Sequence, residues 1–488
     1  MPSRAPGNVA AAVERIRRRL GPAACLETPQ DVAPFVVDFR GLYRGATPLV
    51  ACPASTADVA AVLATCNELG VGVVPHGGNT SYCGGATPGE FGDEIVLSLR
   101  RMNRVREVDP DNFSISVEAG CLLADVQAAA ESVDRFFPLS LGSEGSCQIG
   151  GNLSTNAGGL NAVRYGVTRE LALGLEVVLA DGRVIDGLTS LRKDNTGYDL
   201  RDLFIGAEGT LGVITAASLK LFPRPRTVET AFLAVPDIGA AVQLLARLRA
   251  ATGDGVTSFE FLPRIAVELT AQHVPGVSDP LGRPYPSYVL CEISTAREDP
   301  ALRGLLEASL EQAMADGIVL DAVLAQSLAQ RAALWKLRES VPEAQRAEGA
   351  SIKHDVSVPI AALPRFMAEA SAAVLALVPN GRMVAYGHVG DGNLHFNVSV
   401  PLGGDAELFM AQAPAIHAVV HAIVRQYRGS ISAEHGIGRL KRADLARFKG
   451  AVDLAVMRAI KHALDPNGIL NPGKVLPAAG EFVDGHAT

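Results

Sequence analysis

The stretch VGVVPHGGNTSYCGG, residues 71–85, decides how the first half of the chain is interpreted. The apolar run 71–75 directly follows a helix-periodic segment that ends at Gly70, so it is predicted to be a short buried strand. Gly77 and Gly78 can adopt positive φ, which would let consecutive backbone N–H groups point into one concave pocket, with further donors from Asn79, Thr80 and Ser81. A pyrophosphate fits such a pocket, although a plain strand-to-helix loop has the same composition.

Outward from this loop, short apolar strands alternate with helical stretches. Strands are predicted at 94–99, 114–120 and 175–185, the last with a hairpin at Asp181-Gly182. Glycine is concentrated again at 142–166, where GSEG is followed by IGGNLSTNAGG. So much glycine weakens local structure. Close approach of the backbone to a flat cofactor would explain it, and an irregular loop packed against its own domain is the alternative.

The length of 488 residues exceeds what a single hydrophobic core holds, roughly 250–300 residues, so we expect at least two domains. The apolar and charged fractions, 48% and 20%, are those of a packed globular protein. Two prolines in FPRPR (222–226) mark a boundary. After it, long Ala/Leu helices such as 301–317 and 361–378 alternate with strands such as 287–294. We interpret this part as an α+β domain, followed from about residue 436 by a basic helical tail.

Composition also limits the class of function. The net charge of −8 and the aromatic content of 5% argue against nucleic-acid binding. The basic run RIRRR (15–19) is interpreted as the solvated face of an amphipathic helix, because Glu14 and the scarcity of hydroxyl residues fit a transit peptide poorly.

Seven scattered cysteines without a CxxC pair indicate a reducing compartment. No uninterrupted apolar stretch reaches roughly 18 residues, so we expect no transmembrane segment and a cytoplasmic protein.

Two common nucleotide-binding motifs are missing. No GxGxxG opens a helix after a first strand, which gives an NAD-type Rossmann fold little support. The segment GILNPGK (468–474) imitates a phosphate-binding P-loop. However, Val475 occupies the position of the magnesium-binding Ser or Thr, and Pro472 lies inside the loop. We therefore expect neither of these folds.

The segment YGHVGDGNLHFN (386–397) carries the strongest set of metal-ligand candidates. Apolar and polar residues alternate after its GDGN turn, which predicts a strand with His395 and Asn397 on the polar face. The turn folds the chain back, so that His388 and His395 can meet. With Glu434, in the later SAEHG, they form the two-histidine-plus-carboxylate set of many catalytic metals, although each could instead be a partnered core or loop residue.

Three long segments together resemble the FAD-binding domain of the vanillyl-alcohol-oxidase superfamily: PHGGNTSYCGG (75–85), IGGNLSTNAGGLNAVRYGV (149–167) and DLFIGAEGTLGVIT (202–215). From about Arg44 to Pro477 the chain is most similar to FAD-linked D-2-hydroxyacid dehydrogenases, the group of D-2-hydroxyglutarate dehydrogenases, D-lactate dehydrogenases and glycolate oxidase FAD subunits. The resemblance implies an α+β fold with a two-subdomain FAD-binding domain of the PCMH type. It also implies an α+β, ferredoxin-like cap domain and a C-terminal helical segment that returns to the FAD-binding domain.

The resemblance divides the chain into four segments: an N-terminal helical segment (1–45), the FAD-binding domain (46–225), the substrate or cap domain with the metal site (226–435), and the C-terminal helical segment (436–488). It assigns the FAD pyrophosphate to Pro75, Gly77, Gly78, Asn79 and Thr80. It assigns the flavin and ribityl chain to Pro138, Gly142, Gly151, Thr155, Asn156, Gly158 and Gly159. The site would be completed by Tyr165, Gly166, Glu208, Gly209, Gly212, Ile214 and Asn471. The FAD is expected to be non-covalent, because the histidines that carry a covalent flavin in the superfamily match positions other than His76.

The resemblance further implies a divalent metal, zinc first and manganese or iron(II) next, held by His388, His395 and Glu434. The substrate would be contacted by Arg338, Lys353, Asn397 and His435, with His435 as the catalytic base. A guanidinium and an ammonium group suit a substrate carboxylate. Pro342 stands where the D-2-hydroxyglutarate enzymes of the family carry a hydroxyl residue, which keeps shorter substrates in consideration.

The expected reaction is the metal-assisted oxidation of a D-2-hydroxy acid, D-2-hydroxyglutarate or D-lactate, to the 2-oxo acid, with the hydride passing to flavin N5. The electrons would leave to a protein or quinone acceptor such as electron-transferring flavoprotein, and the family favours a homodimer. Two alternatives remain. One is an FAD-bearing subunit of a multi-component electron-transfer complex without activity of its own. The other is a metal-dependent hydrolase whose glycine-rich loops are structural.

Overall fold

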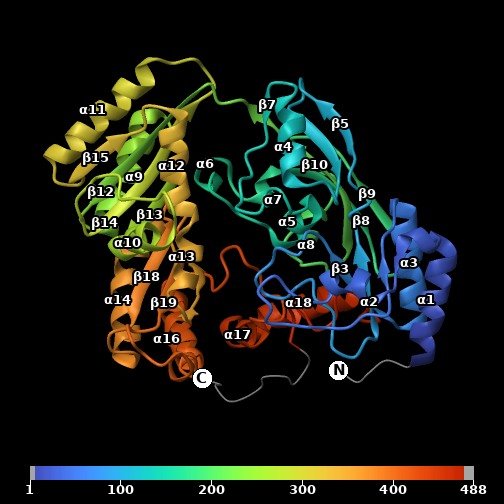
Figure 1. Ribbon diagram of the computed structural model, residues 1–488. Coiled ribbons are helices and arrows are strands. Elements are labelled where there is room, and N and C mark those ends of the chain that lie inside the picture. Colours follow the sequence, from blue (N-terminus) through green and yellow to red (C-terminus); the bar gives the residue numbers. More distant parts are fainter. Residues whose placement is uncertain (1–5, 478–488) are drawn as a thin grey trace. The chain divides into compact units, whose positions relative to one another are not determined.

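The structure is a computed structural model that describes residues 6–477 (Figure 1). Its internal contacts divide the chain into two compact units. The first contains the chain up to Ala157, Val167–Pro223 and the chain from Glu434 onward, and the second contains Gly158–Gly166 and Arg224–Ala433. The outer ends of the predicted N- and C-terminal segments, 1–5 and 478–488, lie outside the described residues.

A small sheet in the first unit positions the glycine-rich loop. Helix α3 (Thr56–Leu69) connects β2 to β3, begins after the capping side chain of Ser55 and ends at Gly70 with a φ of 65°. Strand β4 is parallel to both β2 and β3, as expected for strands joined by a crossover helix. The strand order is β1 (Cys25–Leu26), β2 (Val50–Ala51), β4 (Glu94–Ser98) and β3 (Gly72–His76).

The remainder of the first unit surrounds a five-stranded antiparallel sheet. Its order is β5 (Val105–Asp109), β6 (Ser114–Glu118), β10 (Val213–Lys220), β8 (Ala172–Val178) and β9 (Val184–Gly187). Strands β8 and β9 form the hairpin predicted at Asp181-Gly182, where Gly182 has a φ of 86°. The other elements are α2 (Pro29–Val32), α4 (Leu123–Glu131), α5 (Ile149–Thr155), α7 (Thr168–Leu171), α8 (Arg201–Phe204), and the strand pair β7 (Arg135–Phe136) and β11 (Phe222–Pro223).

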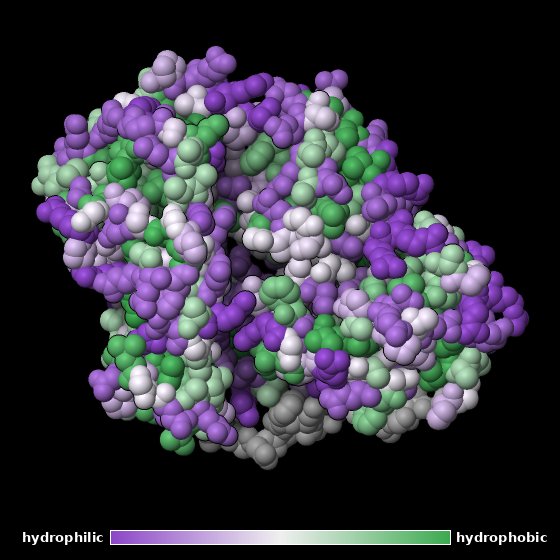
Figure 2. Space-filling view, in the orientation of Figure 1, coloured by the Kyte–Doolittle hydropathy of each residue, from purple (hydrophilic) through white to green (hydrophobic). Residues whose placement is uncertain are grey.

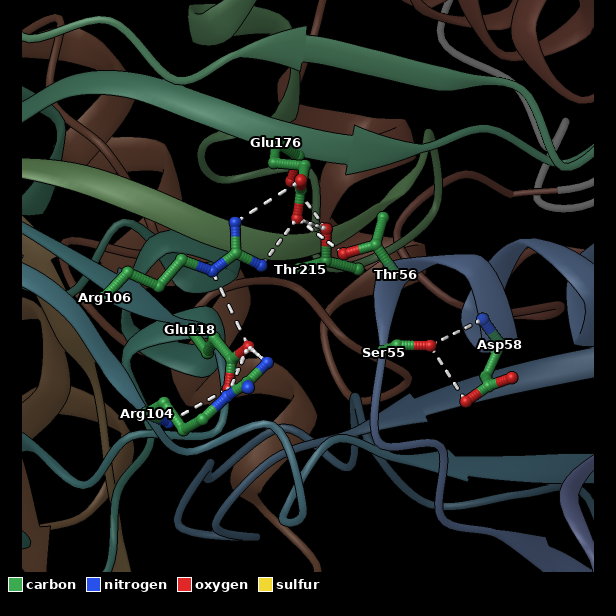
Figure 3. Close-up of polar contacts among 8 residues, drawn as sticks. All are labelled: Ser55, Thr56, Asp58, Arg104, Arg106, Glu118, Glu176 and Thr215. Atoms are coloured by element: carbon green, nitrogen blue, oxygen red, sulfur yellow. Dashed lines mark hydrogen bonds and ion pairs between the residues drawn. The ribbon is translucent and has the colours of Figure 1, made fainter.

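A polar network joins the five-stranded sheet to helix α3 (Figure 3). The Glu176 carboxylate accepts hydrogen bonds from Thr56 at 2.6 Å and Thr215 at 2.8 Å, and it pairs with Arg106 at 3.1 Å. Glu118, whose side chain is fully buried, pairs in turn with Arg104 at 2.8 Å. The arginine of this second pair is 71% exposed, so its charge stays hydrated while the buried carboxylate is satisfied.

The two ends of the described chain both pack in the first unit. Helix α1 (Pro6–Leu20) carries the predicted basic run on its exposed side and buries Ile16, while it packs against α3. At the other end, α17 (Arg442–Phe448) and α18 (Ala451–Leu464) lead to residues 469–471, which hydrogen-bond to Val73 of β3. The C-terminal segment therefore returns to the sheet beside the glycine-rich loop, as the fold class predicted.

The second unit is an antiparallel sheet covered by helices. Its strand order is β15 (Asp321–Leu324), β12 (Thr227–Val235), β14 (Ser287–Thr295), β13 (Val256–Pro263), β18 (Arg382–His388), β19 (Asn393–Ser399) and β16 (Ser351–Ile352), and β17 (Asp355–Ser357) also pairs with β19. One face holds a core that includes Tyr288, Leu290, Leu337 and Tyr386. That core is closed by α10 (Arg264–His273), α12 (Leu328–Glu339) and α13 (Val341–Ala347). A second set of helices comprises α9 (Ile238–Thr252), α11 (Ala301–Ala315), α14 (Leu363–Leu377), α15 (Ala406–Met410) and α16 (Ala413–Gln426).

Residues 158–166 depart from the predicted boundaries, because the sequence pattern grouped them with the FAD-binding domain. Their short helix α6 (Ala162–Tyr165) packs against β13 of the second unit. Arg164 donates to the Ser294 carbonyl at 2.8 Å, and the Ser258 hydroxyl bonds to Asn161 at 3.2 Å. The pattern alone could not assign these residues, since a glycine-rich loop carries no periodicity that identifies its packing partner.

Two helical stretches, Ile360–Leu377 and Ala406–Gln426, are long and apolar enough by composition to cross a membrane. Core helices of globular proteins share this length and composition. Helix α14 is amphipathic in the structure and buries Phe366, Ala370 and Val374. Figure 2 shows hydrophilic and apolar residues mixed over the visible face, without a continuous apolar band.

Candidate functional site

The glycine-rich loop after β3 is shaped by its packing rather than by the positive φ predicted for Gly77 and Gly78. Neither glycine has a positive φ; Asn79 does, at 55°. A Cβ on Gly78 would lie 2.1 Å from the Ser146 carbonyl oxygen, so glycine is required there for close approach of two backbone segments. A Cβ on Gly77 would make only ordinary contacts with Gln148 and Gly151, on the side where the second glycine-rich segment lies. The two segments therefore face each other.

Buried polar atoms without a hydrogen-bond partner gather around this loop. They include both ring nitrogens of His76, Gln148 Oε1, Asn152 Oδ1 and Asn471 Oδ1. Burial, together with a smaller contribution from the positive charge of Arg100, lowers the pKa of His76 to about 4. A buried polar atom without a partner costs about 1–3 kcal/mol, so a cluster of them indicates a site that a polar ligand completes. These residues fit an FAD molecule, whose pyrophosphate, ribityl and isoalloxazine groups offer both donors and acceptors.

Two adjacent glycines of α5 have different roles. A Cβ on Gly150 would lie 2.8 Å from the Ala119 side chain, so this glycine lets α5 pack closely on its neighbour. A Cβ on Gly151 would meet nothing within 4 Å. Glycine in a helix costs roughly 0.5–1 kcal/mol relative to alanine, and packing does not explain Gly151. The open space beside it suits a flat cofactor.

Several of the predicted cofactor side chains are engaged within the protein itself. Asn79 donates to the Val37 carbonyl at 2.8 Å, and Asn156 accepts from the Arg169 N–H at 2.9 Å. Glu208 is buried and accepts from the backbone N–H groups of Ile437 at 2.7 Å and Gly438 at 2.8 Å, while burial raises its pKa. These side chains hold in place the loops around the space between β3 and α5, which we call the cradle. The backbone N–H groups of Asn156 and Glu208 are engaged too, since they bond to the Leu153 carbonyl at 3.0 Å and the Ser154 carbonyl at 2.8 Å.

The other predicted cofactor residues are spread over both units. Asn471 donates to the carbonyls of Gly85 at 2.9 Å and Glu208 at 2.7 Å, which leaves its buried Oδ1 in the cradle. Gly209 packs against the Pro75 ring, and Gly212 is in close contact with Val177. The remaining predicted cofactor residues that lie in the first unit are Thr80, Pro138, Gly142, Thr155 and Ile214. Those that lie in the second unit are Gly158, Gly159, Tyr165 and Gly166.

The second unit contains a buried charge cluster centred on Glu260, which the sequence analysis did not identify. Glu260 lies on β13, is 1% exposed, and bonds to Arg338 Nε at 2.6 Å and to His388 Nδ1 at 2.7 Å. Burial alone would raise the pKa of Glu260, but the charges and hydrogen bonds of Arg338 and His388 outweigh it and lower the pKa to about 2. The sequence did contain a signal for this cluster, because Glu260 is an isolated acid in the apolar strand VTSFEFLP. A buried acid is almost always paired, so a partner could have been expected.

Glu260 also fixes the orientation of the first histidine of the predicted metal site. When His388 donates from Nδ1 to the carboxylate, its Nε2 carries the lone pair that a metal requires. The His395 ring lies 5.4 Å from the His388 ring, centre to centre, and Tyr386 packs on its other side at 5.1 Å. The turn at 390–393 therefore brings the two histidines together, as the sequence predicted.

The predicted substrate residues of the second unit occupy different environments. Arg338 is 6% exposed, and its guanidinium also lies 4.9 Å from the Tyr386 ring centre. Asn397 is buried on β19, where it donates to Gln345 at 2.8 Å. Lys353 is exposed between β16 and β17. Pro342 lies in the first turn of α13.

Glu434 and His435 follow the last residue of the second unit directly. The Ala433 N–H bonds to the Asp355 carbonyl at 3.3 Å, and Ser430 forms a bridge with Ser357, so the chain up to residue 433 is held along β17. Strand β17 in turn pairs Asp355 with His395. In the first unit the His435 ring packs on Tyr82, with ring centres 4.6 Å apart.

Comparison with protein families defines the class. The family model described as "FAD binding domain" matches residues 47–187, and the one described as "FAD linked oxidases, C-terminal domain" matches residues 224–475, more than half of the chain. The protein is thus an FAD-dependent oxidoreductase. Relatives narrow the class, and the chain belongs to the family of FAD-linked D-2-hydroxyacid dehydrogenases.

Three of these relatives cover nearly the whole chain. It is 41% identical to "Probable D-2-hydroxyglutarate dehydrogenase, mitochondrial" of Oryza sativa subsp. indica, over 94% of this chain and 80% of the relative. It is 42% identical to "D-2-hydroxyglutarate dehydrogenase, mitochondrial" of Bos taurus, over 94% and 82%. It is 37% identical to a D-2-hydroxyglutarate–pyruvate transhydrogenase of Saccharomyces cerevisiae, over 92% and 90%.

Solved structures support the fold class. The structure of p-cresol methylhydroxylase with substrate bound matches with a TM-score of 0.75 at 17% identity, over 97% of both chains. At that identity the likeness concerns the fold alone.

The expected cytoplasmic location is wrong by this comparison. The rice and cattle relatives, and those from Arabidopsis thaliana, Danio rerio and Rattus norvegicus, are named as mitochondrial proteins, which points to the mitochondrion. The seven cysteines could not distinguish the two locations, because free thiols indicate a reducing environment without identifying the compartment.

Proposed function

We propose that the protein oxidises a D-2-hydroxy acid to the 2-oxo acid, with D-2-hydroxyglutarate as the first candidate and D-lactate as the second. The observation that carries the proposal is the Glu260 cluster, in which one buried carboxylate orients both a histidine suited to a metal and an arginine suited to a substrate carboxylate. The names of the rice and cattle relatives support D-2-hydroxyglutarate. Pro342 offers no side-chain donor, which keeps D-lactate in consideration.

We assign the substrate carboxylate to Arg338 and Lys353. Arg338 is fixed by its bond to Glu260 and its contact with the Tyr386 ring, so little side-chain entropy remains to be lost when substrate binds. Lys353 adds a positive charge on a flexible stem. Asn397 and His435 would contact the substrate near its 2-hydroxyl group.

FAD would be held non-covalently by the cradle between β3 and α5. Its residues are those that the family resemblance assigned, with the unpartnered atoms of Gln148, Asn152 and Asn471 as additional contacts. When bound, FAD would accept the substrate hydride at N5. Because the histidines that carry a covalent flavin in the superfamily match positions other than His76, the flavin should separate from the polypeptide in acid.

We further propose a divalent metal, zinc first and manganese or iron(II) next, with His388, His395 and Glu434 as ligands. The Nδ1 bond from His388 to Glu260 supports this assignment, because metal-binding histidines commonly donate their second nitrogen to a carboxylate or carbonyl. Glu434 is proposed because the chain one residue before it is held against β17, which pairs with the strand that carries His395. The metal would polarise the 2-hydroxyl group.

His435 is proposed to accept the proton of the 2-hydroxyl group as general base. The His435→Asn variant is expected to slow flavin reduction by D-2-hydroxyglutarate roughly 10²–10⁴-fold, measured by anaerobic stopped flow, while FAD content stays unchanged. The matched control is His462→Asn, an exposed histidine of α18, which should reduce at the wild-type rate. A wild-type rate in His435→Asn would exclude the role.

The electron acceptor is proposed to be electron-transferring flavoprotein or a quinone. The yeast relative, named as a transhydrogenase with pyruvate, adds a 2-oxo acid as a further candidate acceptor. Reoxidation of the reduced enzyme by each acceptor would rank them.

A homodimer is proposed from the family resemblance, with sedimentation as its test. If the purified protein binds FAD but no D-2-hydroxy acid reduces it, the alternative of a subunit without activity of its own would replace the enzymatic proposal.

A further inference from the structure

Three histidines form a cluster on the face of the second unit's sheet opposite to the proposed catalytic residues. They are His354, between β16 and β17, and His417 and His421 on α16. Successive residues of a strand point to opposite faces, so Phe396 of β19 lies on the other face from His395. The Phe396 ring packs on Phe366 of α14 at 5.6 Å and on His354 at 6.1 Å, which places the cluster with α14 and α16.

The cluster has the spacing of a metal site. The three ligand atoms all lie within 4.8 Å of one another. His417 and His421 are four residues apart on one helix face, the arrangement by which two histidines of a zinc-binding helix share a metal, and their rings are near-parallel with centres 5.7 Å apart. His417 Nδ1 lies 2.9 Å from His354 Nε2. This contact is a hydrogen bond, which His417 Nδ1 donates because His354 Nε2 carries no hydrogen. Ligand atoms of tetrahedral zinc are about 3.3 Å apart, so this pair would become two ligands if His417 moved its hydrogen to Nε2 and the two nitrogens separated by about 0.4 Å.

The surroundings of His354 prepare it as a ligand. His354 is 3% exposed, and its Nδ1 lies 2.8 Å from the Phe396 carbonyl oxygen. A carbonyl only accepts, so Nδ1 carries the hydrogen and Nε2 presents its lone pair to the other two histidines. Donation of the second ring nitrogen to a backbone carbonyl is the usual support of a metal-binding histidine. His417 and His421 are only half-buried, which gives an ion a path from solvent.

We propose that His354, His417 and His421 bind a zinc ion, distinct from the proposed catalytic metal. Three imidazoles suit zinc, with water completing the tetrahedron. The ion would join α16 to the loop between β16 and β17, and through that loop to β19. Its role would be structural, since the face of the sheet that it occupies is opposite to that of His395.

The test is the zinc stoichiometry of the metal-stripped, FAD-loaded enzyme, measured by calorimetric titration and by elemental analysis after dialysis. The wild type is expected to bind one equivalent more than the His417→Ala/His421→Ala variant, and His462→Ala should match the wild type. In a His388→Ala background, zinc should still bind at one equivalent and raise the thermal unfolding temperature. This part of the experiment distinguishes the two proposed metal sites, because the His388→Ala change removes a ligand of the proposed catalytic metal and leaves the three-histidine cluster intact.

The proposal is overturned if His417→Ala/His421→Ala keeps the wild-type stoichiometry, or if the His388→Ala enzyme binds no zinc. Should the double variant fail to fold, the single His421→Gln change at a half-buried position gives the same comparison. Flavin reduction should remain at the wild-type rate in His421→Gln if the ion is structural. Loss of zinc together with loss of reduction would assign the cluster to catalysis and contradict the structural role.

Discussion

Two sites, one in each unit, differ in how their buried polar groups are partnered. Around the loop after β3, the first unit holds buried polar atoms of His76, Gln148, Asn152 and Asn471 without hydrogen-bond partners. In the second unit, by contrast, Glu260 uses both carboxylate oxygens, one for Arg338 and one for His388. The first arrangement leaves donors and acceptors open to a polar ligand, for which we propose FAD. The second is complete in advance and holds charged groups at fixed positions, as electrostatic stabilisation of a reaction requires.

The largest expected effect comes from breaking the Glu260 cluster. Removing one partner of a buried ion pair typically costs 3–5 kcal/mol, and loss of a second-sphere carboxylate weakens metal binding 10–100-fold. We therefore expect Glu260→Gln to lose about 3–5 kcal/mol of unfolding free energy and 10–100-fold in zinc affinity. Denaturant titration and competition with a chelator would measure the two quantities.

Glu118→Gln is the matched control for that change (Figure 3). Glu118 is equally buried and pairs with arginine, but Arg104 is largely exposed and can return to water when its partner is lost. Zinc affinity should be unchanged in this variant and the loss of stability smaller. An equal loss of zinc affinity in both variants would remove Glu260 from the proposed metal site.

The next effect concerns His76 and pH. Its pKa is about 4 in the folded protein and about 6.5 when unfolded, so the unfolded state binds more protons as the pH falls below 6.5. The contribution of His76 to the free energy of unfolding should therefore be fully present above pH 6.5. It should decrease by up to about 3 kcal/mol as the pH falls toward 4. His76→Gln should lose less stability between pH 7.5 and pH 5 than the wild type, in urea titrations of the FAD-free protein. Parallel losses in the two proteins would mean that other groups control the acid response.

The smallest expected effect separates two neighbouring glycines of α5. Gly151→Ala should stabilise the FAD-free protein by roughly 0.5–1 kcal/mol, because its Cβ would meet no protein atom. The same methyl group would occupy space intended for the cofactor and weaken FAD binding at least about tenfold, or roughly 1.4 kcal/mol. Gly150→Ala should instead destabilise the protein, since its Cβ would collide with Ala119. Unchanged FAD affinity in Gly151→Ala would remove this face of α5 from the cradle.

The sequence predicted those features that follow from short-range pattern. The helix before Gly70, the hairpin at Asp181-Gly182 and the turn that joins His388 to His395 all follow from periodicity and turn residues. Features that depend on packing between distant segments were missed or misattributed. Gly78 is needed because Ser146 lies against it, not for a positive φ, and no local pattern could reveal that contact.

The same limit applies to the sites. The metal-ligand candidates could be recognised because histidines beside a GDGN turn form a short motif. Glu260 is distant in sequence from both of its partners, and the register of β13 with β18 brings it beside His388. His354, His417 and His421 likewise come together only through the fold, since α16 lies far along the chain from the β16–β17 loop.

The proposed activity requires that the cradle holds FAD and that a D-2-hydroxy acid reduces it. The most direct measurement is the visible spectrum of the purified enzyme under anaerobic conditions, before and after addition of D-2-hydroxyglutarate, L-2-hydroxyglutarate or D-lactate. We expect a yellow protein whose oxidised-flavin band disappears with a D-acid and persists with the L-acid. A flavin that stays oxidised with every D-2-hydroxy acid would contradict the proposed reaction, and a colourless protein that added FAD does not restore would contradict the cradle itself.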